Sequence, residues 1–221
     1  MTVTVLTFVA VAVCSYLLGN FNAAIAISKL KKKDIRKLGS GNPGTMNMFR
    51  NFGKAIGMLT LFLDALKGAI PCLAGWFFCG ELFRFGGNRI GLYVGALSVI
   101  TGHIFPVFYK FKGGKGIASS VGVCLVLNWW ATLISFTVGA LFLIFIKIGS
   151  ITSFIIISFP IALNAYTLAE QGGNLACLIL LFCIFCLTLF AHTKNVIKLY
   201  GGTERKVILF KKKKKQPQNA L

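Results

Sequence analysis

The chain has 221 residues, 56% of them hydrophobic, with 24 Lys and Arg against five Asp and Glu and a formal net charge of +19. Apolar residues in this proportion, gathered in long blocks, exclude an ordinary soluble domain and predict an all-α polytopic membrane protein, because backbone amides in a bilayer must be satisfied within helices. The positive charge lies in the loops between the blocks, where it sets membrane topology and faces anionic lipid headgroups, so no nucleic-acid partner is expected.

The first half of the chain predicts three membrane-spanning helices. The first apolar block covers about residues 2–27, and the basic segment SKLKKKDIRK follows it instead of a small-residue cleavage site, which predicts a retained span. A second block covers about residues 55–79, and a third covers about residues 90–109. Each block is long enough to cross the hydrocarbon core as a helix.

The second half begins with an apolar block that is too long for one crossing. Residues 117–146 would form a helix of about 45 Å, whereas the hydrocarbon core is about 30 Å thick. The segment LNWW (127–130) lies in the middle and is typical of an interfacial anchor, so we expect one span near 117–129 and another near 131–147. Two further spans are expected over residues 151–168 and 174–191.

The charge distribution predicts the orientation of this bundle of seven transmembrane helices. With the N-terminus outside, every Lys and Arg lies on the cytoplasmic side except Arg84, Arg89 and Lys67, the last of which lies within the second span. The C-terminus is then cytoplasmic as well. A five-span arrangement that treats residues 117–146 differently stays open, and it leaves the polar loops on the same side.

The sequence predicts one membrane-embedded domain over residues 1–206 and a basic cytoplasmic tail over residues 207–221, which acts as a lipid-facing anchor. Seven cysteines are scattered through the apolar blocks, and the pair in CIFC (183–186) has no second pair nearby. We expect the cysteines to be small buried hydrophobic side chains, without a disulfide framework or a metal site.

Three polar segments on the expected cytoplasmic side have the chemistry of anion binding, and the first is GSGNPGTMNMFR (39–50). Asn42 and Pro43 resemble an N-cap and a first helical residue, and a helix N-terminus with free amides binds anions. Ser40 adds a hydroxyl and Arg50 a guanidinium that can bind phosphate in a bidentate manner. The alternative is a Gly/Asn turn that caps a helix and binds nothing.

The second segment is GHIFPVFYKFKGGKG (102–116). It is not a nucleotide-binding P-loop, because Gly116 follows Lys115 where Ser or Thr is required and no strand precedes it. It predicts a glycine turn entering a helix at Ile117, with backbone amides and ammonium groups forming a phosphate nest. The alternative is a loop that is basic only for topology, but topology requires no paired glycines. The candidate phosphate-binding residues are Lys110, Lys112, Gly113, Gly114 and Lys115.

The third segment is AHTKNVIKLYGGTE (191–204). His192 and Asn195 are three residues apart, so both side chains can point from one helical face, and Glu204 is one of the five acids. The only other histidine, His103, lies in the second segment. A lone interfacial histidine is usually a polar anchor, but the shared placement of both histidines favours a functional role.

An ionisable pair, Asp64 and Lys67, lies within the second span at a spacing of three residues. Ionisable groups inside a membrane helix are costly, and they are usually paired or functional. We expect a structural intrahelical ion pair, with support of the phosphate site by Lys67 as the alternative.

In combination, DIRKLGSGNPGTMNMFR, GHIFPVFYKFKGGKG and H-x-x-N followed by GTE closely resemble the PlsY family of bacterial acyl-phosphate:glycerol-3-phosphate acyltransferases, in the family's order, and DALKG (64–68) is similar as well. The resemblance covers about residues 14–206. It implies a seven-helix membrane bundle with an active site at the cytoplasmic side of the bacterial plasma membrane. The implied reaction moves an acyl group from acyl phosphate to the 1-hydroxyl of glycerol 3-phosphate, giving 1-acylglycerol 3-phosphate (lysophosphatidate) and phosphate.

The resemblance also implies roles for individual residues. The expected partners are glycerol 3-phosphate, acyl phosphate and membrane lipid, with no cofactor and a monomeric chain. Two positions depart from the family pattern: Met46 replaces a threonine, and Ala191 stands where a basic residue often precedes the histidine, so Lys194 and Lys198 would compensate. The expected catalytic residues are His192, Asn195 and Ser40; the expected substrate-binding residues are Arg50, Asn42, Lys110, Lys112, Gly113, Gly114, Lys115, His103 and Glu204.

The mechanism expected from these residues is direct acyl transfer. Phosphate is a good leaving group, so the protein mainly has to gather two phosphates and align a hydroxyl with a carbonyl. Neither histidine is followed by Asp at the spacing of the other glycerolipid acyltransferase class, and no nucleophile paired with a base is evident. The base is either His192 or a substrate phosphate oxygen. A small transporter or channel for an organic phosphate or another anion is the rival class, but a transporter would place its site near the midplane, often between repeats.

Overall fold

The computed structural model describes residues 2–82, 89–204 and 206–207, and the ordered elements in this part are all helices, as predicted. The predicted tail therefore lies almost wholly outside the described residues. The elements are α1 (Thr2–Asn20), α2 (Ala23–Leu30), η1 (Ile35–Lys37), α3 (Thr45–Phe52), α4 (Lys54–Trp76), η2 (Phe77–Leu82), α5 (Ile90–Ile104), η3 (Val107–Tyr109), α6 (Ile117–Leu127), α7 (Trp129–Ile146), α8 (Gly149–Glu170), α9 (Leu175–Ala191) and α10 (Thr193–Tyr200).

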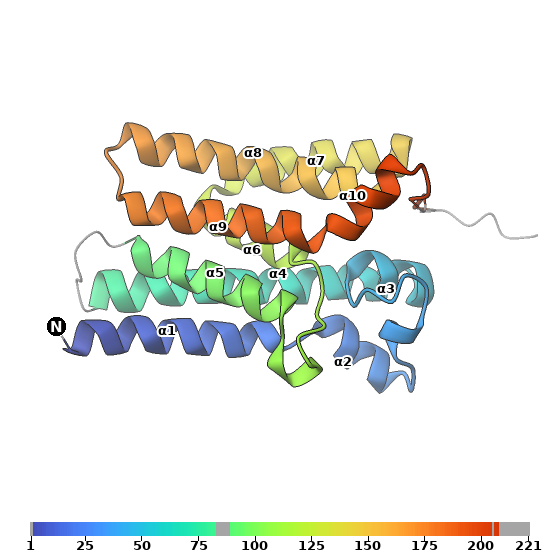
Figure 1. The fold of residues 1–221 in the computed structure, drawn as a ribbon, viewed down its shortest axis with the longest axis horizontal. Helices are drawn as coiled ribbons and strands as arrows, with labels where there is room; N and C mark the ends of the chain where they lie inside the picture. Colours follow the sequence, from blue (N-terminus) through green and yellow to red (C-terminus); the bar gives the residue numbers. More distant parts are fainter. Residues whose placement is uncertain (1, 83–88, 205, 208–221) are drawn as a thin grey trace, which may run out of the picture.

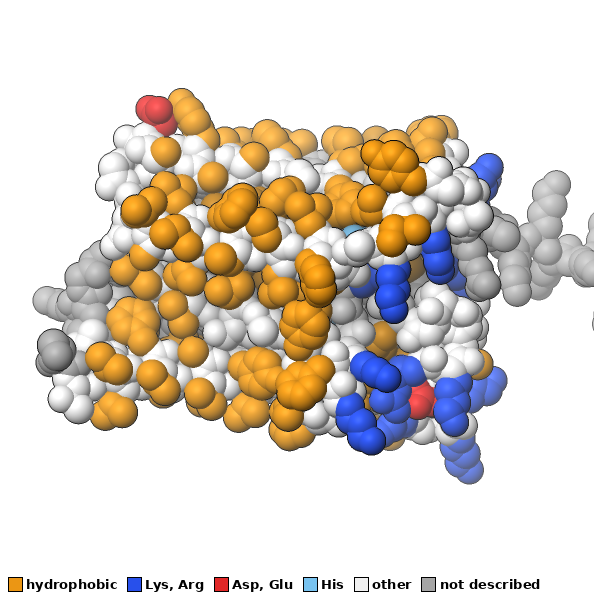
Figure 2. Space-filling view, viewed as in Figure 1, with side chains coloured by type: hydrophobic (Ala, Val, Ile, Leu, Met, Phe, Trp, Pro, Cys, Tyr) orange, Lys and Arg blue, Asp and Glu red, His pale blue; other side chains and the backbone are white. Residues whose placement is uncertain are grey.

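The long helices lie side by side, and the chain reverses direction between successive ones (Figure 1). Helix α1 packs on α5, α4 packs on both α5 and α6, and α9 joins α5 to the α7–α8 pair through α8. The short helices α2, α3 and α10 lie together at one end of the bundle. On the face in view, Lys and Arg side chains gather at this same end, while apolar side chains cover much of the remaining length (Figure 2). The fold thus has one cationic end and an apolar flank.

Within the residues that the structure describes, five helices are long and apolar enough to cross a membrane, and α9 with α10, bent by 54°, makes a sixth candidate. Helix α6 is the exception, because its 11 residues give a length of only about 16 Å. It was expected as a short span near residues 117–129, and it ends two residues earlier. The architecture is therefore that of an integral membrane helical protein with five or six candidate spans by length.

The first span, expected to be continuous over residues 2–27, is broken in the structure. Helix α1 ends at Asn20, and Asn22 begins α2 by accepting a hydrogen bond from the Ile25 amide at 3.0 Å. The Asn22 amide group also donates to the Pro43 carbonyl at 3.1 Å. Asparagine side chains can form hydrogen bonds with backbone groups that would otherwise bond within a helix. The bonds made by Asn22 therefore explain why the helix is interrupted inside an apolar block.

The Asp64–Lys67 pair in α4 stabilises this break. Lys67 Nζ lies 3.1 Å from Asp64 Oδ1 and donates to the carbonyls of Gly19 and Phe21, at 3.3 and 2.5 Å. The Asp64 carboxylate lies beside the amide of Ala23 at the start of α2. The cation thus lies at the C-terminus of α1 and the anion at the N-terminus of α2, which suits both helix dipoles. The expected intrahelical ion pair is confirmed.

Removing only the cation of this pair is expected to destabilise the protein strongly. Lys67→Met leaves a buried carboxylate and two helix-end carbonyls without the ammonium, and we expect a loss of about 3–5 kcal/mol in the free energy of unfolding. Unfolding of the detergent-solubilised protein measures this loss. The double variant Asp64→Leu/Lys67→Met should recover much of it, because no unpaired charge is left. Equal stability of Lys67→Met and the parent chain would contradict this account.

The predicted break at LNWW is confirmed between α6 and α7. Asn128 ends α6 and accepts a hydrogen bond from the Ala131 amide at 3.4 Å, which starts α7. Trp129 and Trp130 follow directly and are 65% and 45% exposed. Exposed tryptophans at a helix start are typical of a membrane interface, so their position agrees with the anchor that was expected.

The cysteines divide into two groups. Four of them are buried as expected, but Cys14, Cys183 and Cys186 are exposed, so the expectation of burial was wrong for the CIFC pair. These three thiols lie on the uncovered outer face of α1 and α9. In a bilayer such a face meets acyl chains, where cysteine is tolerated as a small apolar residue.

Candidate active site

The loop between α5 and α6 folds back onto the end of α5. The Gly113 amide donates to the Ile104 carbonyl at 3.1 Å, and the Gly114 amide donates to the His103 carbonyl at 3.0 Å. Two left-handed residues, Lys110 and Phe111, make the reversal possible. The loop therefore satisfies the last carbonyls of α5, which would otherwise have no partner.

The two glycines of this loop are required by close approach to α5. A Cβ atom at Gly113 would lie 2.0 Å from the His103 carbonyl oxygen, and one at Gly114 would lie 2.2 Å from His103 Nε2. Both amides are used by α5 carbonyls, so they do not form the phosphate nest that was expected. The sequence indicated that these glycines serve more than topology, and the structure shows that close packing against the end of α5 requires them.

His103 supports the loop from inside the protein. Its side chain is 3% exposed, with Nδ1 at 3.4 Å from Ser119 Oγ and 4.0 Å from Asp64 Oδ1. Gly114 covers the other side of its ring. The expected contact of His103 with substrate is therefore not supported, because its ring is enclosed between α4, α6 and the loop.

A chain of hydrogen bonds joins the second and third polar segments. Lys115 Nζ donates to Asn195 Oδ1, and Asn195 Nδ2 donates to Glu204 Oε1 at 3.2 Å. Ser150 Oγ, at the start of α8, donates to Glu204 Oε2 at 2.5 Å. Glu204 thus uses both oxygens to hold Asn195 and Ser150. Its negative charge also balances Lys115.

Lys115 is the cation at one end of this chain. Burial lowers the pKa of Lys115 to about 8, and the positive charges of Lys198 and Arg50 act in the same direction, while Glu204 opposes them. Lys198 and Arg50 therefore lie close enough to repel Lys115 electrostatically. Cations from three separate segments thus act on one another here, and a bound anion would offset their repulsion.

His192 lies between α9 and α10, next to this cluster. Its Nδ1 is 2.9 Å from the Thr188 carbonyl, and since a carbonyl only accepts, Nδ1 carries the proton and Nε2 is an acceptor. The ring packs on Phe154 with 5.1 Å between ring centroids. Burial lowers the pKa of His192 to about 4, against the Thr188 hydrogen bond, so the imidazole is neutral at pH 7. The site thus holds a fixed, neutral hydrogen-bond acceptor.

The other two loop lysines lie apart from this cluster. Lys110 and Lys112 are exposed, and neither side chain forms an ion pair or hydrogen bond within the part of the chain that the structure describes. Only Lys115 is partly buried and bonded to another segment. The structure therefore distinguishes three lysines that the sequence treated alike.

The first polar segment is organised around Asn47. This residue is 2% exposed; it donates to the carbonyls of Ile35 and Leu38 at 3.2 and 2.9 Å and accepts from the Ser40 amide at 3.2 Å. Ser40 Oγ in turn accepts from the Asn42 amide at 3.4 Å. Ser40 and Asn42 thus lie on a loop of fixed shape that precedes α3.

Helix α3 begins later than expected. Asn42 and Pro43 were expected to be its N-cap and first residue, but the helix begins at Thr45, with Gly44 as an N-cap that makes no side-chain hydrogen bond. The Pro43 carbonyl is held by Asn22, which keeps this residue outside the helix. Met46, the departure from the family pattern, lies near Gly149 at the start of α8.

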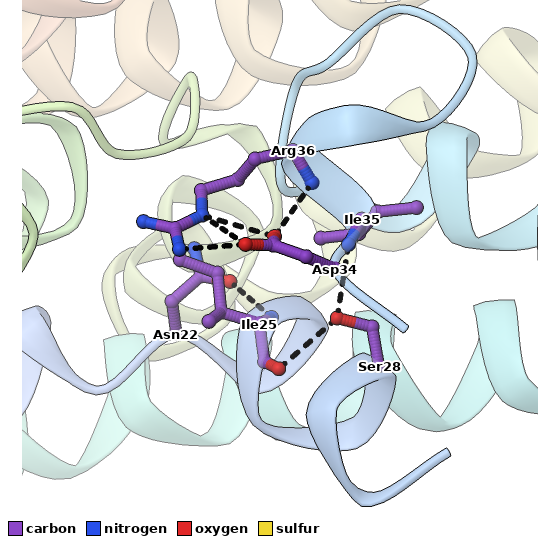
Figure 3. Close-up of polar contacts among 6 residues, drawn as sticks. All are labelled: Asn22, Ile25, Ser28, Asp34, Ile35 and Arg36. Carbon is purple, nitrogen blue, oxygen red and sulfur yellow. Dashed lines mark hydrogen bonds and ion pairs between the residues drawn. The ribbon is translucent and has the colours of Figure 1, made fainter. Parts of the chain in front are cut away.

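The basic segment before this loop is held by local polar contacts (Figure 3). Ser28 Oγ accepts from the Ile35 amide at 3.1 Å, and the Arg36 guanidinium donates to both oxygens of Asp34. The hydrogen bond to Arg36 lowers the pKa of the Asp34 carboxyl to about 2, so this ion pair persists at any physiological pH. The segment from α2 to η1 is therefore a hairpin held by local hydrogen bonds and an ion pair.

Two site residues were not found by sequence reasoning. Ser150 lies in the turn KIGS, which was considered only as a break between spans, and Asn47 lies within the first motif but was given no role. A polar residue at the start of an apolar helix, on the side that holds the motifs, was the available signal for Ser150. The partner of Ser150 lies 54 residues away along the chain, and the Ile35, Leu38 and Ser40 backbone groups that bond to Asn47 lie 7 to 12 residues away, so helical spacing did not indicate these contacts.

The chain matches the sequence pattern of the glycerol-3-phosphate acyltransferase family over residues 9–202. Among curated proteins, glycerol-3-phosphate acyltransferases of Endomicrobium trichonymphae and Thermotoga petrophila are 36% and 37% identical, with 91% and 90% of this chain and 96% of each relative covered. The Mycoplasmopsis pulmonis protein of the same name is 34% identical over 96% of this chain and 98% of its own.

Solved structures agree with the sequence comparisons. Two crystal structures of PlsY (YgiH), an integral membrane glycerol 3-phosphate acyltransferase, superpose with TM-scores of 0.76 and 0.75 at 32% identity, covering 90% and 91% of this chain and 94% and 96% of theirs. One is its glycerol 3-phosphate form and the other its lysophosphatidic acid form. The motifs, the helical membrane fold and these comparisons lead to one conclusion: the chain belongs to the glycerol-3-phosphate acyltransferase family and is an acyltransferase.

Proposed function

We propose that the protein transfers an acyl group from acyl phosphate to the 1-hydroxyl of sn-glycerol 3-phosphate, giving 1-acylglycerol 3-phosphate and phosphate. The observation that carries the proposal is the convergence of Lys115, Arg50 and Lys198 beside Asn195 and His192, at the end of an apolar bundle. The cations suit the phosphate groups of both substrates, and the bundle suits an acyl chain. Relatives solved with glycerol 3-phosphate and with lysophosphatidic acid support the same reaction.

In the proposed reaction, Lys115 and Arg50 hold the phosphates, and His192 Nε2 accepts a hydrogen bond from the reacting hydroxyl. The hydroxyl oxygen forms a bond with the acyl carbon, and the bond from that carbon to the phosphate oxygen breaks. The hydroxyl proton ends on the departing phosphate. Placing both reactants in one site and stabilising their charge supplies most of the acceleration such a transfer needs.

The choice of base follows from the burial of His192. With a pKa of about 4, this imidazole is a weaker base than a phosphate oxygen, whose second pKa is about 6. We therefore assign the proton to a substrate phosphate oxygen and the orientation of the hydroxyl to His192. Asn195, held by Glu204, fixes Lys115 and completes the positioning.

We propose the seven-crossing topology with the N-terminus outside, in a bacterial plasma membrane. The cationic end in Figure 2 would then face the cytoplasm, as lysine- and arginine-rich loops do. Helix α6, although short, runs between the cationic end and the α6–α7 turn, and it would count as a crossing. We also propose that the chain acts as a monomer, as the resemblance to the family implies.

A transporter of organic phosphates is the rival function, and the site does not favour it. A transporter binds its substrate near the membrane midplane between broken helices. Here the cations gather at one end of the bundle, and the known relatives are acyltransferases.

Acylation assays with the purified full chain test the proposal. We expect labelled glycerol 3-phosphate and palmitoyl phosphate to give labelled 1-palmitoylglycerol 3-phosphate, and acyl-CoA and acyl carrier protein donors to give little. The Arg50→Ala variant should lose most of the rate. Absence of product with all three donors would contradict the proposed acyltransferase activity. A product formed only from acyl-CoA would contradict acyl phosphate as the acyl donor.

The low pKa of Lys115 predicts a pH dependence. Below about pH 8 the side chain is protonated and binds phosphate, and above it the neutral amine does not, so KM for glycerol 3-phosphate should rise up to about tenfold per pH unit above pH 8. The substrate phosphate is already fully ionised there. Lys115→Arg should flatten the rise, because arginine stays charged. Initial-rate measurements from pH 7 to 9.5 test this; identical profiles for both proteins would contradict it.

A further inference from the structure

An open cavity of about 480 Å³ lies outside the active site, between the tip of the α2–η1 hairpin and the end of α3. Leu30, Phe52 and three consecutive lysines, Lys31, Lys32 and Lys33, line it. The volume falls within the range of small-molecule sites in proteins. Its lining combines three positive charges with two apolar side chains. Such a lining suits a ligand that carries both a negatively charged group and an apolar part.

The three lysines have no internal partner that would account for them. Within the described residues, no carboxylate forms an ion pair with them, because Asp34 at the base of the hairpin is bound by Arg36 through both oxygens. Backbone hydrogen bonds hold the segment that carries them. The Lys31 amide donates to the Ile27 carbonyl and the Lys33 amide to the Ser28 carbonyl, while the Lys32 backbone adopts the left-handed conformation. Like charges held together in this way favour an external anion.

The apolar surroundings indicate that this anion is a lipid. Leu30 is 85% exposed at the hairpin tip, which would be unfavourable in water but suits the acyl region of a leaflet. The neighbouring η3 loop contacts the hairpin through Tyr109, whose ring lies 6.0 Å from Lys29 and 5.6 Å from Arg36, and this loop exposes Phe108 and Phe111. Lysines interleaved with exposed apolar tips are typical of a membrane-surface contact.

We propose that this cavity binds the headgroup of an anionic phospholipid, with the phosphate among Lys31, Lys32 and Lys33 and the glycerol and first acyl carbons against Leu30 and Phe52. The site is separate from acyl transfer: none of its residues belongs to the Lys115–Asn195–Glu204 chain. It is also more specific than general attraction of a basic loop to a membrane, because it requires both the lysines and the apolar rim.

Native mass spectrometry of the delipidated full chain, titrated with phosphatidylglycerol, tests the site. Each lysine near a lipid headgroup contributes about a fivefold change in affinity, so Lys31→Gln/Lys33→Gln should weaken the tightest binding event about thirtyfold. The matched control Lys147→Gln/Lys206→Gln removes two exposed lysines elsewhere and should leave that event unchanged. An unchanged thermal midpoint establishes that the hairpin variant is folded.

Further measurements test whether the bound ligand is an anionic phospholipid. Leu30→Gln should weaken phosphatidylglycerol binding about tenfold, and phosphatidylcholine should bind the parent chain far less tightly than phosphatidylglycerol. Inorganic phosphate at millimolar concentration should not displace the lipid. The proposal would be overturned if both double lysine variants weakened phosphatidylglycerol binding equally, or if Leu30→Gln had no effect on it. Displacement of the lipid by inorganic phosphate would also overturn it, because the cavity would then be a site for a free anion.

Discussion

Replacing Lys115 by Met is expected to lower kcat/KM for glycerol 3-phosphate by about 10²–10³-fold, the usual cost of removing one preorganised electrostatic contact. Lys115 is the loop lysine that is partly buried and bonded to Asn195, so its charge is fixed where the cations of three segments meet. Steady-state acylation with palmitoyl phosphate measures the loss. An increase in KM together with a decrease in kcat is expected, since the charge acts on bound substrate and on the transition state.

The neighbouring lysine provides a matched control. Lys112→Met removes the same charge from the same loop, but its side chain is exposed, and we expect kcat/KM to stay within about threefold. Lys115→Arg, which keeps the charge, should retain more activity than Lys115→Met. Equal losses in Lys112→Met and Lys115→Met would mean that the loop acts only through its total charge, contrary to the geometry.

Replacing Gly114 by Ala is expected to lower activity about 10²-fold even though one methyl group is added. The new Cβ would lie 2.2 Å from His103 Nε2, a distance that requires the loop or the imidazole to move. Overpacking of this kind costs about 1–3 kcal/mol, and a shift of about 1 Å at the adjacent Lys115 is enough to cost 10²-fold in rate. Acylation rates and thermal unfolding of the variant measure the two effects.

A second substitution separates steric strain from a direct role of Gly114 in binding. His103→Ser removes the ring that the added methyl group meets, so Gly114→Ala/His103→Ser should be more active than Gly114→Ala alone. Gly113→Ala should gain nothing from His103→Ser, because its Cβ meets the His103 backbone carbonyl at 2.0 Å. No recovery in the first pair, or equal recovery in both, would contradict the packing explanation.

The helical segments could be predicted well from the sequence, because apolar blocks in a bilayer have one structural solution. The break at LNWW was predictable since the block was too long for one crossing. The break at Asn20–Asn22 was not, because two asparagines in an apolar block carry no periodicity signal, and the partners that stabilise the break, Lys67 and Pro43, are distant in sequence.

The site was predictable as a set of segments but not as a set of contacts. Charge and glycine patterns placed Lys110, Lys112 and Lys115 together, whereas only burial and the bond to Asn195 distinguish Lys115. The paired glycines indicated a special backbone, yet the cause was the close approach of α5 and not a phosphate nest. Sequence patterns show which residue types are available, and packing decides which of them face a ligand.

A crystal structure of the full chain with glycerol 3-phosphate bound tests the central claim most directly. The account predicts the phosphate within hydrogen-bonding distance of Lys115 Nζ, next to Arg50, with the 1-hydroxyl directed at His192 Nε2. A phosphate bound by Lys110 and Lys112, or at the α2–η1 hairpin, with Lys115 still joined only to Asn195, would contradict it.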